Sequence, residues 1–426
     1  MRALLPVVLV SCLATPATAE LSAIERRIVD HVAGEVPAAL DLLERTVNVN
    51  SGTLNFEGVR QVGAMLAPEF EALGFTTEWI DGSEFGRAGH LVAHRGDGGP
   101  HLLLIGHLDT VFEPDSPFQR FERLGDEEAK GPGSTDMKGG NVVMLFALRA
   151  LAAVDALDGA RLTVVLTGDE EKSGRPLSAA RQVLLETDAD VAIGFEDGDS
   201  DPRTAVIARR GSTGWELRVT GVPAHSSQVF TEAVGAGAIY EAARILTEFR
   251  ARLADEADLT FNPGVILGGT HVEFDADAAR GSAFGKDNVV AEHAVVSGDI
   301  RALSPQQYER AKAVMLAVAA DHLPRTEAEL TFDPGYPPLA ATDGNRELLE
   351  LYSEVSQDLG LGPVRAVDPR KAGAADVAFV SGRVPRVLDG IGLMGRGGHT
   401  VDEVADLSTL PTQTQRAALL IYRLTR

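Results

Sequence analysis

The stretch LLLIGHLDTV, residues 102–111, decides the fold that this sequence predicts. It begins as an unbroken aliphatic run, which is typical of a strand buried on both faces of a parallel sheet. It ends with His107 and Asp109. The strand could simply reach water at a turn there. Alternatively, the strand end holds a metal ligand, His107, and a carboxylate, Asp109, that orients the imidazole ring.

The segments around this strand alternate between helical and strand patterns. Helical apolar spacing is found at 23–47, 59–73, 137–152 and 178–186, and short apolar strands at 90–94, 102–105, 162–166 and 191–195. Such alternation predicts an α/β domain with a central, mostly parallel sheet. The same style returns after about residue 333, with helices expected at 345–359 and 408–424.

Between residues 206 and 329 the pattern changes. We expect a half-buried strand at 215–219, a helix at 233–253, strands around Val265 and at 289–300, a helix from the Ser304-Pro305 start signal to 323, and a strand at 329–332. The order β-α-β-β-α-β indicates a ferredoxin-like α+β domain. It would be inserted into a discontinuous α/β domain formed by residues 20–205 and 330–426.

Composition limits the partners and the location of this protein. The 426 residues carry a formal net charge of −23, which disfavours nucleic acid and anionic membrane surfaces as partners. Residues 1–19 read as a signal peptide cleaved after Ala19, and the apolar run is too short for a stable membrane span, so we expect a periplasmic or secreted protein. Lipid anchoring at Cys12, the single cysteine, is less favoured because the leader would then be unusually short.

Acids and histidines follow strands or lie in glycine-rich loops at five places: His107 with Asp109, Asp136 in GPGSTDMKGG, Glu170 with Glu171 in TGDEEKSG, Glu196 in GFEDGD, and His399 in GRGGHTVDE. Open α/β sheets bind ligands beyond the carboxyl ends of their strands. Each place alone has an ordinary explanation: Asp136 could cap the helix that follows it, and DEE could be an exposed acidic turn. Together, two histidines and three carboxylates suit two divalent, zinc-like ions that each keep an open position.

The same residues suggest a division of roles. A carboxylate such as Asp136 can bridge both ions and offset their repulsion. Glu171 can bind a metal, while the adjacent Glu170 cannot face the same ion and is free to take a proton from water. Asp109 can accept the second N–H of the His107 ring.

In this order, GHLDTV, GPGSTDMKGG, TGDEEKSG, FED and GGHT resemble the motifs of the di-zinc exopeptidases and amidohydrolases that include glutamate carboxypeptidase, acetylornithine deacetylase, succinyl-diaminopimelate desuccinylase and aminoacylase. The resemblance covers nearly all of the chain after the leader, including the insert. It implies one zinc held by His107, Asp136 and Glu196, and a second held by Asp136, Glu171 and His399. Glu170 would be the general base and Asp109 the partner of His107. A cis peptide after Asp136 is also implied.

The insert resembles the lid and dimerisation domain of that family. VTGVPAHSSQ matches a lid segment, which implies that His225 reaches the active site of a partner subunit in a homodimer and stabilises the oxyanion. KDNVV and SGDIRA place Asn288 and Arg301 where the family holds the oxyanion or a substrate carboxylate, a group that a bidentate guanidinium suits. Arg301 could instead be a surface salt-bridge partner.

Substrate identity is the least determined feature. Glu196 preceded by Phe195 resembles the glutamate carboxypeptidase and deacylase branch, and KAGAADVAFV resembles a substrate loop ending in Asp376, although Ala375 and Asp197 depart from the usual residues. We expect a zinc-dependent exopeptidase that cleaves an amide next to a free carboxylate, with Co²⁺ or Mn²⁺ as substitutes for Zn²⁺. The alternatives are an N-acyl-amino-acid deacylase or dipeptidase and, more remotely, a catalytically silent peptide-binding homologue.

Overall fold

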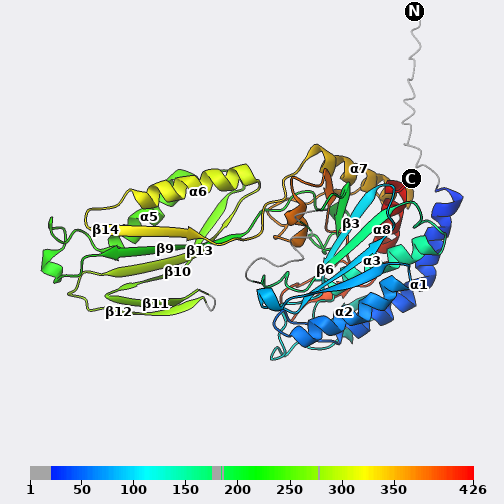
Figure 1. Ribbon diagram of the computed structural model, residues 1–426, viewed down its shortest axis with the longest axis horizontal. Coiled ribbons are helices and arrows are strands. Elements are labelled where there is room, and N and C mark those ends of the chain that lie inside the picture. The colour runs from blue at the N-terminus through cyan, green and yellow to red at the C-terminus, as the bar shows by residue number, and fades with distance from the viewer. Residues whose placement is uncertain (1–20, 175–183, 185–186, 277–278) are drawn as a thin grey trace, which may run out of the picture.

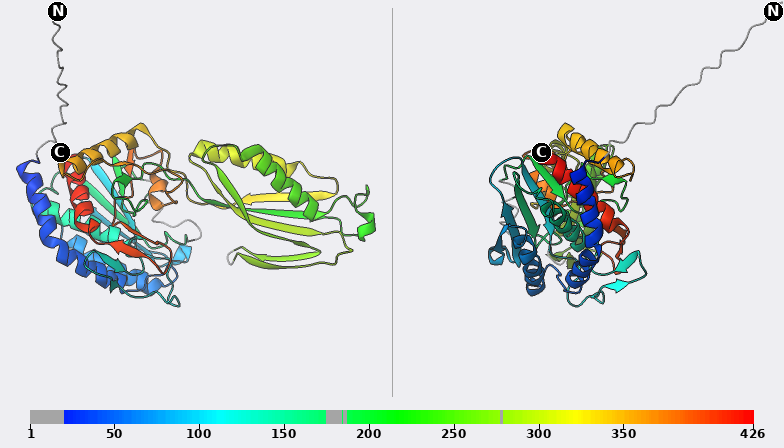
Figure 2. Two further views of the ribbon diagram at one scale, coloured as in Figure 1. Left: turned by 180° about the vertical axis from the view of Figure 1, so that it is seen from behind. Right: turned by 90° about the vertical axis from the view of Figure 1, so that its right-hand side faces the viewer.

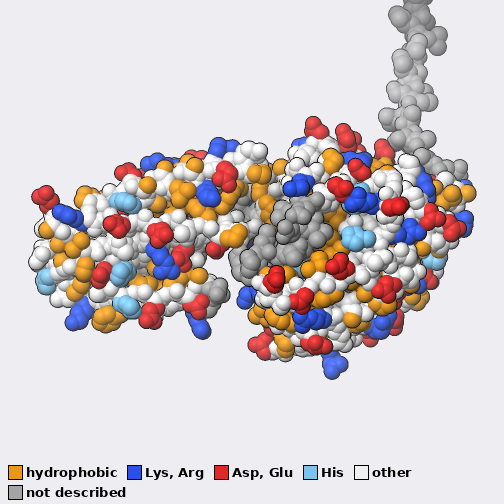
Figure 3. All heavy atoms as spheres, in the orientation of Figure 1, with side chains coloured by type: hydrophobic (Ala, Val, Ile, Leu, Met, Phe, Trp, Pro, Cys, Tyr) orange, Lys and Arg blue, Asp and Glu red, His pale blue; other side chains and the backbone are white. Residues whose placement is uncertain are grey.

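The computed structural model describes residues 21–174, 184, 187–276 and 279–426, which form two lobes joined side by side (Figure 1). The predicted leader lies outside the described residues, as does almost all of the helix predicted at 178–186. No helix in the described part of the chain combines the length and the apolar character that a membrane span needs. On the face seen in Figure 3, basic side chains are scattered among acidic ones over both lobes.

The larger lobe is built on a six-stranded sheet with the order β1 (Thr76–Asp81), β2 (Gly89–Arg95), β6 (Arg161–Thr167), β3 (His101–His107), β7 (Val191–Gly194) and β16 (Arg386–Leu388). The strands β6, β3, β7 and β16 are parallel, whereas β1 and β2 pair antiparallel. The sheet is therefore mixed, and its parallel part contains the strand of the opening stretch. A short connection joins β1 to β2, and such a connection favours antiparallel pairing.

Helices and loops cover both faces of this sheet. All seven residues of β3 are buried. Leu102 and Leu104 pack toward α1 (Ala23–Val47), α3 (Lys138–Ala152) and α8 (Thr409–Leu424), while Leu103 and Ile105 pack toward η3 (Asp376–Val380). α2 (Phe56–Glu71) lies against β1 and β2, and α7 (Asp343–Asp358) against β16. The continuous aliphatic run of β3 is thus explained by burial on both sides.

Local signals position these helices. α1 begins at a capping box in which the Ser22 hydroxyl accepts from the Glu25 N–H and the Glu25 carboxylate accepts from the Ser22 N–H. The second and third residues of α3 are glycines, and a Cβ at Gly140 would lie 1.9 Å from the carbonyl oxygen of Phe195. Only glycine therefore allows the start of α3 to come this close to the end of β7. This approach brings the loop before α3 next to Glu196.

A second small sheet was not predicted from the sequence. It has the order β17 (Gly395–Arg396), β18 (Val404–Asp406), β5 (Glu128–Lys130) and β4 (Glu122–Arg123). Its strands are two or three residues long, too short to show a hydrophobic period. The sheet joins the loop that carries His399 to the segment that precedes Asp136.

The smaller lobe contains β9 (Thr213–Gly221), α5 (Ala238–Leu253), β10 (Thr260–Gly269), β13 (His293–Arg301), α6 (Pro305–Ala320) and β14 (Thr326–Phe332). The antiparallel sheet has the order β10-β13-β9-β14, and both helices pack on one face of it (Figure 2). This is the predicted ferredoxin-like arrangement. A hairpin of β11 (His271–Asp275) and β12 (Arg280–Phe284) was missed, because the chain between these strands carries no strong turn signal.

The chain passes between the lobes twice, along two adjacent segments. Arg209 pairs with Leu339 and Ser212 pairs with Tyr336 in antiparallel bridges. The predicted boundary at 329/330 falls within β14. Pairing of the two segments continues outside the insert's sheet, which apolar alternation does not reveal.

Candidate metal centre

The five predicted metal ligands come from the carboxyl ends of strands and from two loops. His107 ends β3, Glu171 follows β6 and Glu196 follows β7, while Asp136 lies in the loop before α3 and His399 lies between β17 and β18. The structure brings these five side chains together. The Asn141 side chain on α3 donates to the main-chain oxygen of His107 at 2.6 Å and holds the end of β3 in place.

Asp136 lies between the two histidines. Nε2 of His107 is 3.0 Å from Oδ1 of Asp136, and Nε2 of His399 is 2.9 Å from Oδ2 of the same carboxylate. Nε2 of His107 is also 3.6 Å from Oε1 of Glu196, and Nε2 of His399 is 3.1 Å from Oε2 of Glu171. One carboxylate oxygen thus faces each histidine, as a bridging ligand requires. The peptide bond after Asp136 is cis.

The donor set fits divalent cations. His107, Asp136 and Glu171 present donor atoms that lie within 4.8 Å of one another. The Glu171 side chain is only 3% exposed, and its buried Oε1 has no hydrogen-bond partner among the described residues. Burying several carboxylates together is unfavourable unless positive charge accompanies them. Imidazole and carboxylate donors in this combination suit two zinc-like ions.

Burial and close contacts shift the pKa values of the acids and histidines in this cluster. Burial raises the pKa of Glu171 to about 7 and raises the pKa of Glu196 well above its usual range. Burial also opposes the charge of Asp136, but hydrogen bonds from His107 and His399 outweigh it and lower that pKa. Hydrogen bonds to Asp136 and Glu171 raise the pKa of His399 to about 11. Protons on the histidines therefore supply positive charge that bound cations would replace.

Glu170 lies beside this cluster, where its carboxyl interacts with the charges of His107 and Glu171. Its main-chain N–H donates to Oδ1 of Asp109 at 3.2 Å, and its main-chain oxygen accepts from the Tyr336 hydroxyl at 2.7 Å. Burial raises the pKa of the Glu170 carboxyl well above its usual range, and the His107 charge opposes that shift. A raised proton affinity suits a group that takes up and returns a proton near neutral pH.

Asp109 does more than the sequence predicted. Nδ1 of His107 lies 3.0 Å from the main-chain oxygen of Asp109 and 3.4 Å from its Oδ1, so the main chain shares the expected orienting role. The carboxylate accepts from the main-chain N–H groups of Glu170 and Glu171, both at 3.2 Å, and from the Thr53 hydroxyl at 2.7 Å. Asp109 thus also fixes the loop that carries the predicted base, Glu170.

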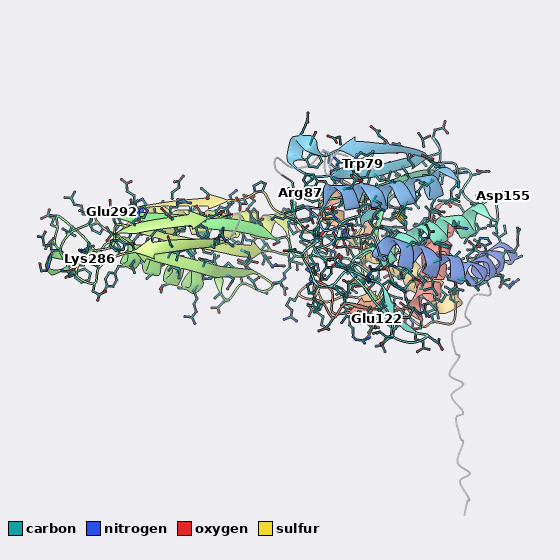
Figure 4. The ribbon with its side chains drawn as sticks, turned by 90° about the horizontal axis from the view of Figure 1, so that it is seen from below. Trp79, Arg87, Glu122, Asp155, Lys286 and Glu292 are labelled. Carbon is teal, nitrogen blue, oxygen red and sulfur yellow. The ribbon has the colours of Figure 1, made fainter. Side chains whose placement is uncertain are left out.

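Two predicted lid residues lie far from the cluster within one chain. His225 is exposed and forms a bridge with Val289, next to Asn288. Figure 4 shows Lys286, on the same loop, at the end of the smaller lobe that points away from the larger lobe. Arg87, whose guanidinium binds the main-chain oxygen of Lys172 at 2.7 Å, lies on the side of the larger lobe that faces the smaller one.

The other two predicted substrate residues each bond to a partner within the chain. Arg301 is half-buried, and its Nε donates to Oδ2 of Asp299 at 2.8 Å. This ion pair corresponds to the alternative role of Arg301 as a salt-bridge partner. Asp376 begins η3, is buried, and accepts from the Thr167 hydroxyl. Because η3 packs on the sheet, Asp376 does not line an open substrate surface in this structure. Its negative charge instead contributes to the raised pKa of Glu170.

Several residues that position the cluster were not singled out from the sequence. The Asp389 carboxylate accepts from the Glu196 N–H at 3.3 Å and forms a buried ion pair with Arg209 at 2.7 Å. No local pattern connects these distant positions. Glu403 binds the loop that ends in Asp136, and it did carry a signal, because it is the last acid of GRGGHTVDE.

Comparison with known proteins places this geometry in context. The model of a family described as peptidase family M20/M25/M40 matches residues 103–423. Carboxypeptidase G2 from Pseudomonas sp. (strain RS-16) is 27% identical over 400 residues, covering 92% of this chain and 90% of that protein. Succinyl-diaminopimelate desuccinylase from Acidiphilium cryptum (strain JF-5) is 28% identical over 392 residues, covering 89% and 95%. A solved Bacillus subtilis structure, described as a dinuclear metal-binding peptidase of the M20 family, has a TM-score of 0.64 at 16% identity and covers 92% of this chain and 99% of its own.

Proposed function

Because the chain belongs to peptidase family M20/M25/M40 and is therefore a metal-dependent hydrolase, we propose that it is an exopeptidase that cleaves an amide bond next to a free carboxylate. The substrate would be a small peptide or an N-acyl amino acid. One observation carries this proposal: two histidines and two partly buried glutamates meet around the Asp136 carboxylate, and the carboxyl of Glu170 lies beside them. The names of the two relatives, a carboxypeptidase and a desuccinylase, support it.

Two Zn²⁺ ions would be held by the sets that share Asp136. His107 and Glu196 would complete one position, and Glu171 and His399 the other. When bound, the cations supply Lewis acidity toward water and toward the substrate carbonyl. Asp109 holds His107 and the Glu170–Glu171 loop in place. The remaining chemistry belongs to the side chains of this chain.

Glu170 would accept a proton from the attacking water on its carboxylate. It would then return that proton to the leaving amine nitrogen as the amide bond breaks. The oxyanion that develops on the carbonyl oxygen requires a donor, and His225 is the residue proposed for it. Asn288 and Arg301 are proposed to bind the oxyanion or the free carboxylate of the substrate.

The position of His225 leads to a proposal about assembly. His225 and Asn288 lie on two paired loops at the far end of the smaller lobe, so they cannot serve the cluster of their own chain in this arrangement. We therefore propose a homodimer formed through the smaller lobe, in which His225 completes the site of the partner subunit. Export to the periplasm or beyond, with a mature N-terminus at Glu20, is part of the same proposal. N-terminal sequencing of the protein from fractionated cells would test the location.

The first experiment measures hydrolysis and metal content on one sample. Purified mature protein is assayed with N-acyl amino acids that carry acidic, basic and apolar leaving groups, and with dipeptides. Turnover that a chelator removes and Zn²⁺ restores supports the proposal. Preference for N-acetyl substrates or for dipeptides would instead indicate the deacylase or dipeptidase alternative. Two bound metals with no turnover on any substrate would favour a silent peptide-binding homologue.

Adjacent glutamates provide a matched pair of variants. Glu170→Gln removes the proposed base and should lower kcat by at least about 10² to 10⁴-fold while two metals stay bound. Glu171→Gln removes a ligand and should instead lower the metal content. Metal analysis and steady-state kinetics of both variants separate the two roles. Full activity of the Glu170 variant would contradict the assignment.

A further inference from the structure

Glu403 joins the two loops that meet in the candidate metal centre. It follows His399 by four residues, it directly precedes β18, and its side chain is completely buried. We propose that Glu403 is a positioning residue that sets the distance between Asp136 and His399, and thereby the affinity of the metal position that these two ligands share. This inference rests on the proposed metal site, but it concerns a residue outside the ligand set.

The Glu403 carboxylate accepts four hydrogen bonds from the loop that ends in Asp136. Oε1 accepts from the N–H of Thr135 at 2.8 Å, from its hydroxyl at 3.1 Å and from the N–H of Asp136 at 3.3 Å. Oε2 accepts from the N–H of Gly133 at 3.0 Å. Main-chain N–H groups that converge on one anion form a nest, and bonds to a charged acceptor are stronger than neutral ones. The bridging ligand is therefore fixed through its own main chain.

The main chain of Glu403 holds the other loop. Its N–H donates to the main-chain oxygen of Thr400 at 3.1 Å, within the turn that carries His399. Its carbonyl oxygen accepts from the N–H of Gly131 at 3.3 Å. His399 itself has a φ of 63°, a left-handed conformation that is uncommon for a residue with a side chain. Glu403 thus connects a constrained ligand turn to the loop of the bridging carboxylate.

The two metal positions should depend on Glu403 to different degrees. Asp136 and His399, both held through Glu403, belong to one position. The other position also uses His107, which is fixed independently by the Asp109 main chain and by Asn141. Removing a side chain that supports a ligand typically weakens metal binding by about 10 to 100-fold. The loss should therefore fall mainly on the position with His399.

The test compares metal binding by two glutamate-to-glutamine variants. Glu403→Gln keeps the side-chain size but turns an N–H donor toward other N–H groups. Glu241→Gln is the matched control: Glu241 is equally buried and accepts from the Leu323 N–H at 3.2 Å, but it lies in the smaller lobe. Metal-free proteins are titrated with Zn²⁺ against a chromophoric chelator and with Co²⁺ followed by its visible absorption. The melting temperatures of both variants and of the wild type are also measured.

We expect Glu403→Gln to weaken one of two binding steps by about 10 to 100-fold and the other by less than about threefold, with an altered Co²⁺ spectrum. Glu241→Gln should keep wild-type affinities even if its melting temperature falls. Unchanged affinities, or equal weakening of both steps, would overturn the positioning role. If Glu403→Gln does not fold, Thr135→Val removes one of the four bonds at constant size and should shift the same step in the same direction. A wild-type chain that binds fewer than two cations would instead count against the proposed function.

Discussion

At the scale of single residues, hydrogen bonds from other residues hold three of the proposed ligands in place. The Asp109 main chain orients His107, and Asp389 receives the N–H of Glu196. Glu403 does the same for the loop of Asp136. Such supporting contacts decide whether a ligand is already in place before a cation arrives. The site is therefore ordered by the fold, and its protonation state is what a cation must change.

The ionisation of Glu171 and His399 predicts how metal binding depends on pH. Burial raises the pKa of Glu171 from 4.5 to about 7, and bonds to carboxylates raise the pKa of His399 from 6.5 to about 11. Both groups hold protons more tightly in the folded, metal-free chain than in the unfolded one. These groups therefore make the free energy of unfolding of the metal-free protein fall as pH rises above about 4.5.

Cations must displace these protons, so Zn²⁺ affinity should rise between about pH 5.5 and 7.5, by up to about tenfold per pH unit for each proton released. Calorimetric titrations in buffers of different ionisation enthalpy would count the protons. Melting curves of chelator-treated protein across the same pH range give the stability. An affinity that stays constant with pH would contradict the assignment of His399 as a protonated ligand in the metal-free state.

At the scale of elements, the two segments that connect the lobes also contact the loops of the candidate site. Arg209, on the outgoing segment, forms the buried ion pair with Asp389 that supports Glu196. Tyr336, on the returning segment, donates to the main chain of Glu170. The connection between the lobes thus supports both the proposed base, Glu170, and one proposed ligand, Glu196.

Tyr336→Phe removes the hydroxyl that donates to the main-chain oxygen of Glu170 and leaves the size of the side chain almost unchanged. A net contribution of about 1 kcal/mol for one hydrogen bond corresponds to a fall in kcat of about fivefold, with two metals still bound. Tyr308→Phe is the control, because that hydroxyl lies on α6 in the smaller lobe. Kinetics with metal analysis on the same samples would test this. A rise in KM with kcat unchanged would show that Tyr336 acts on substrate binding instead.

At the scale of the whole molecule, the arrangement of the lobes separates His225 from the cluster of its own chain. If the site is completed in trans, two inactive variants should complement each other. In a heterodimer of Glu170→Gln with His225→Ala, the second subunit keeps its base and receives an intact His225 from the first. One of the two sites is then complete.

Heterodimers purified through two different tags should therefore show about half the wild-type turnover per dimer, while each homodimer is nearly inactive. Light scattering would establish the dimer first. A heterodimer as inactive as both parents would show that His225 does not act across subunits. A fully active monomer would contradict the dimeric site altogether.

Periodicity and local signals were sufficient for most elements. The predicted helix at 23–47 matches α1, and the predicted order of the insert matches β9 to β14. These elements have long apolar stripes or clear start signals, which are local properties of the chain. The short strands of the second sheet were missed because pairing with distant segments defines them. The β11–β12 hairpin was missed because no strong turn signal marks it.

The sequence by itself determined the kinds of group at the candidate site and their placement at strand ends and loops. Strand burial and motif spacing are properties of short stretches of sequence, so they can be recognised without the tertiary structure. Only the tertiary structure decided which oxygen of Asp136 faces which histidine, that Asp376 is buried, and that His225 lies away from its own cluster. It also identified Arg209, Tyr336 and Glu403 as residues that hold the loops of the candidate site in place. Those contacts join residues far apart in the chain, and their distances depend on how the packed elements meet.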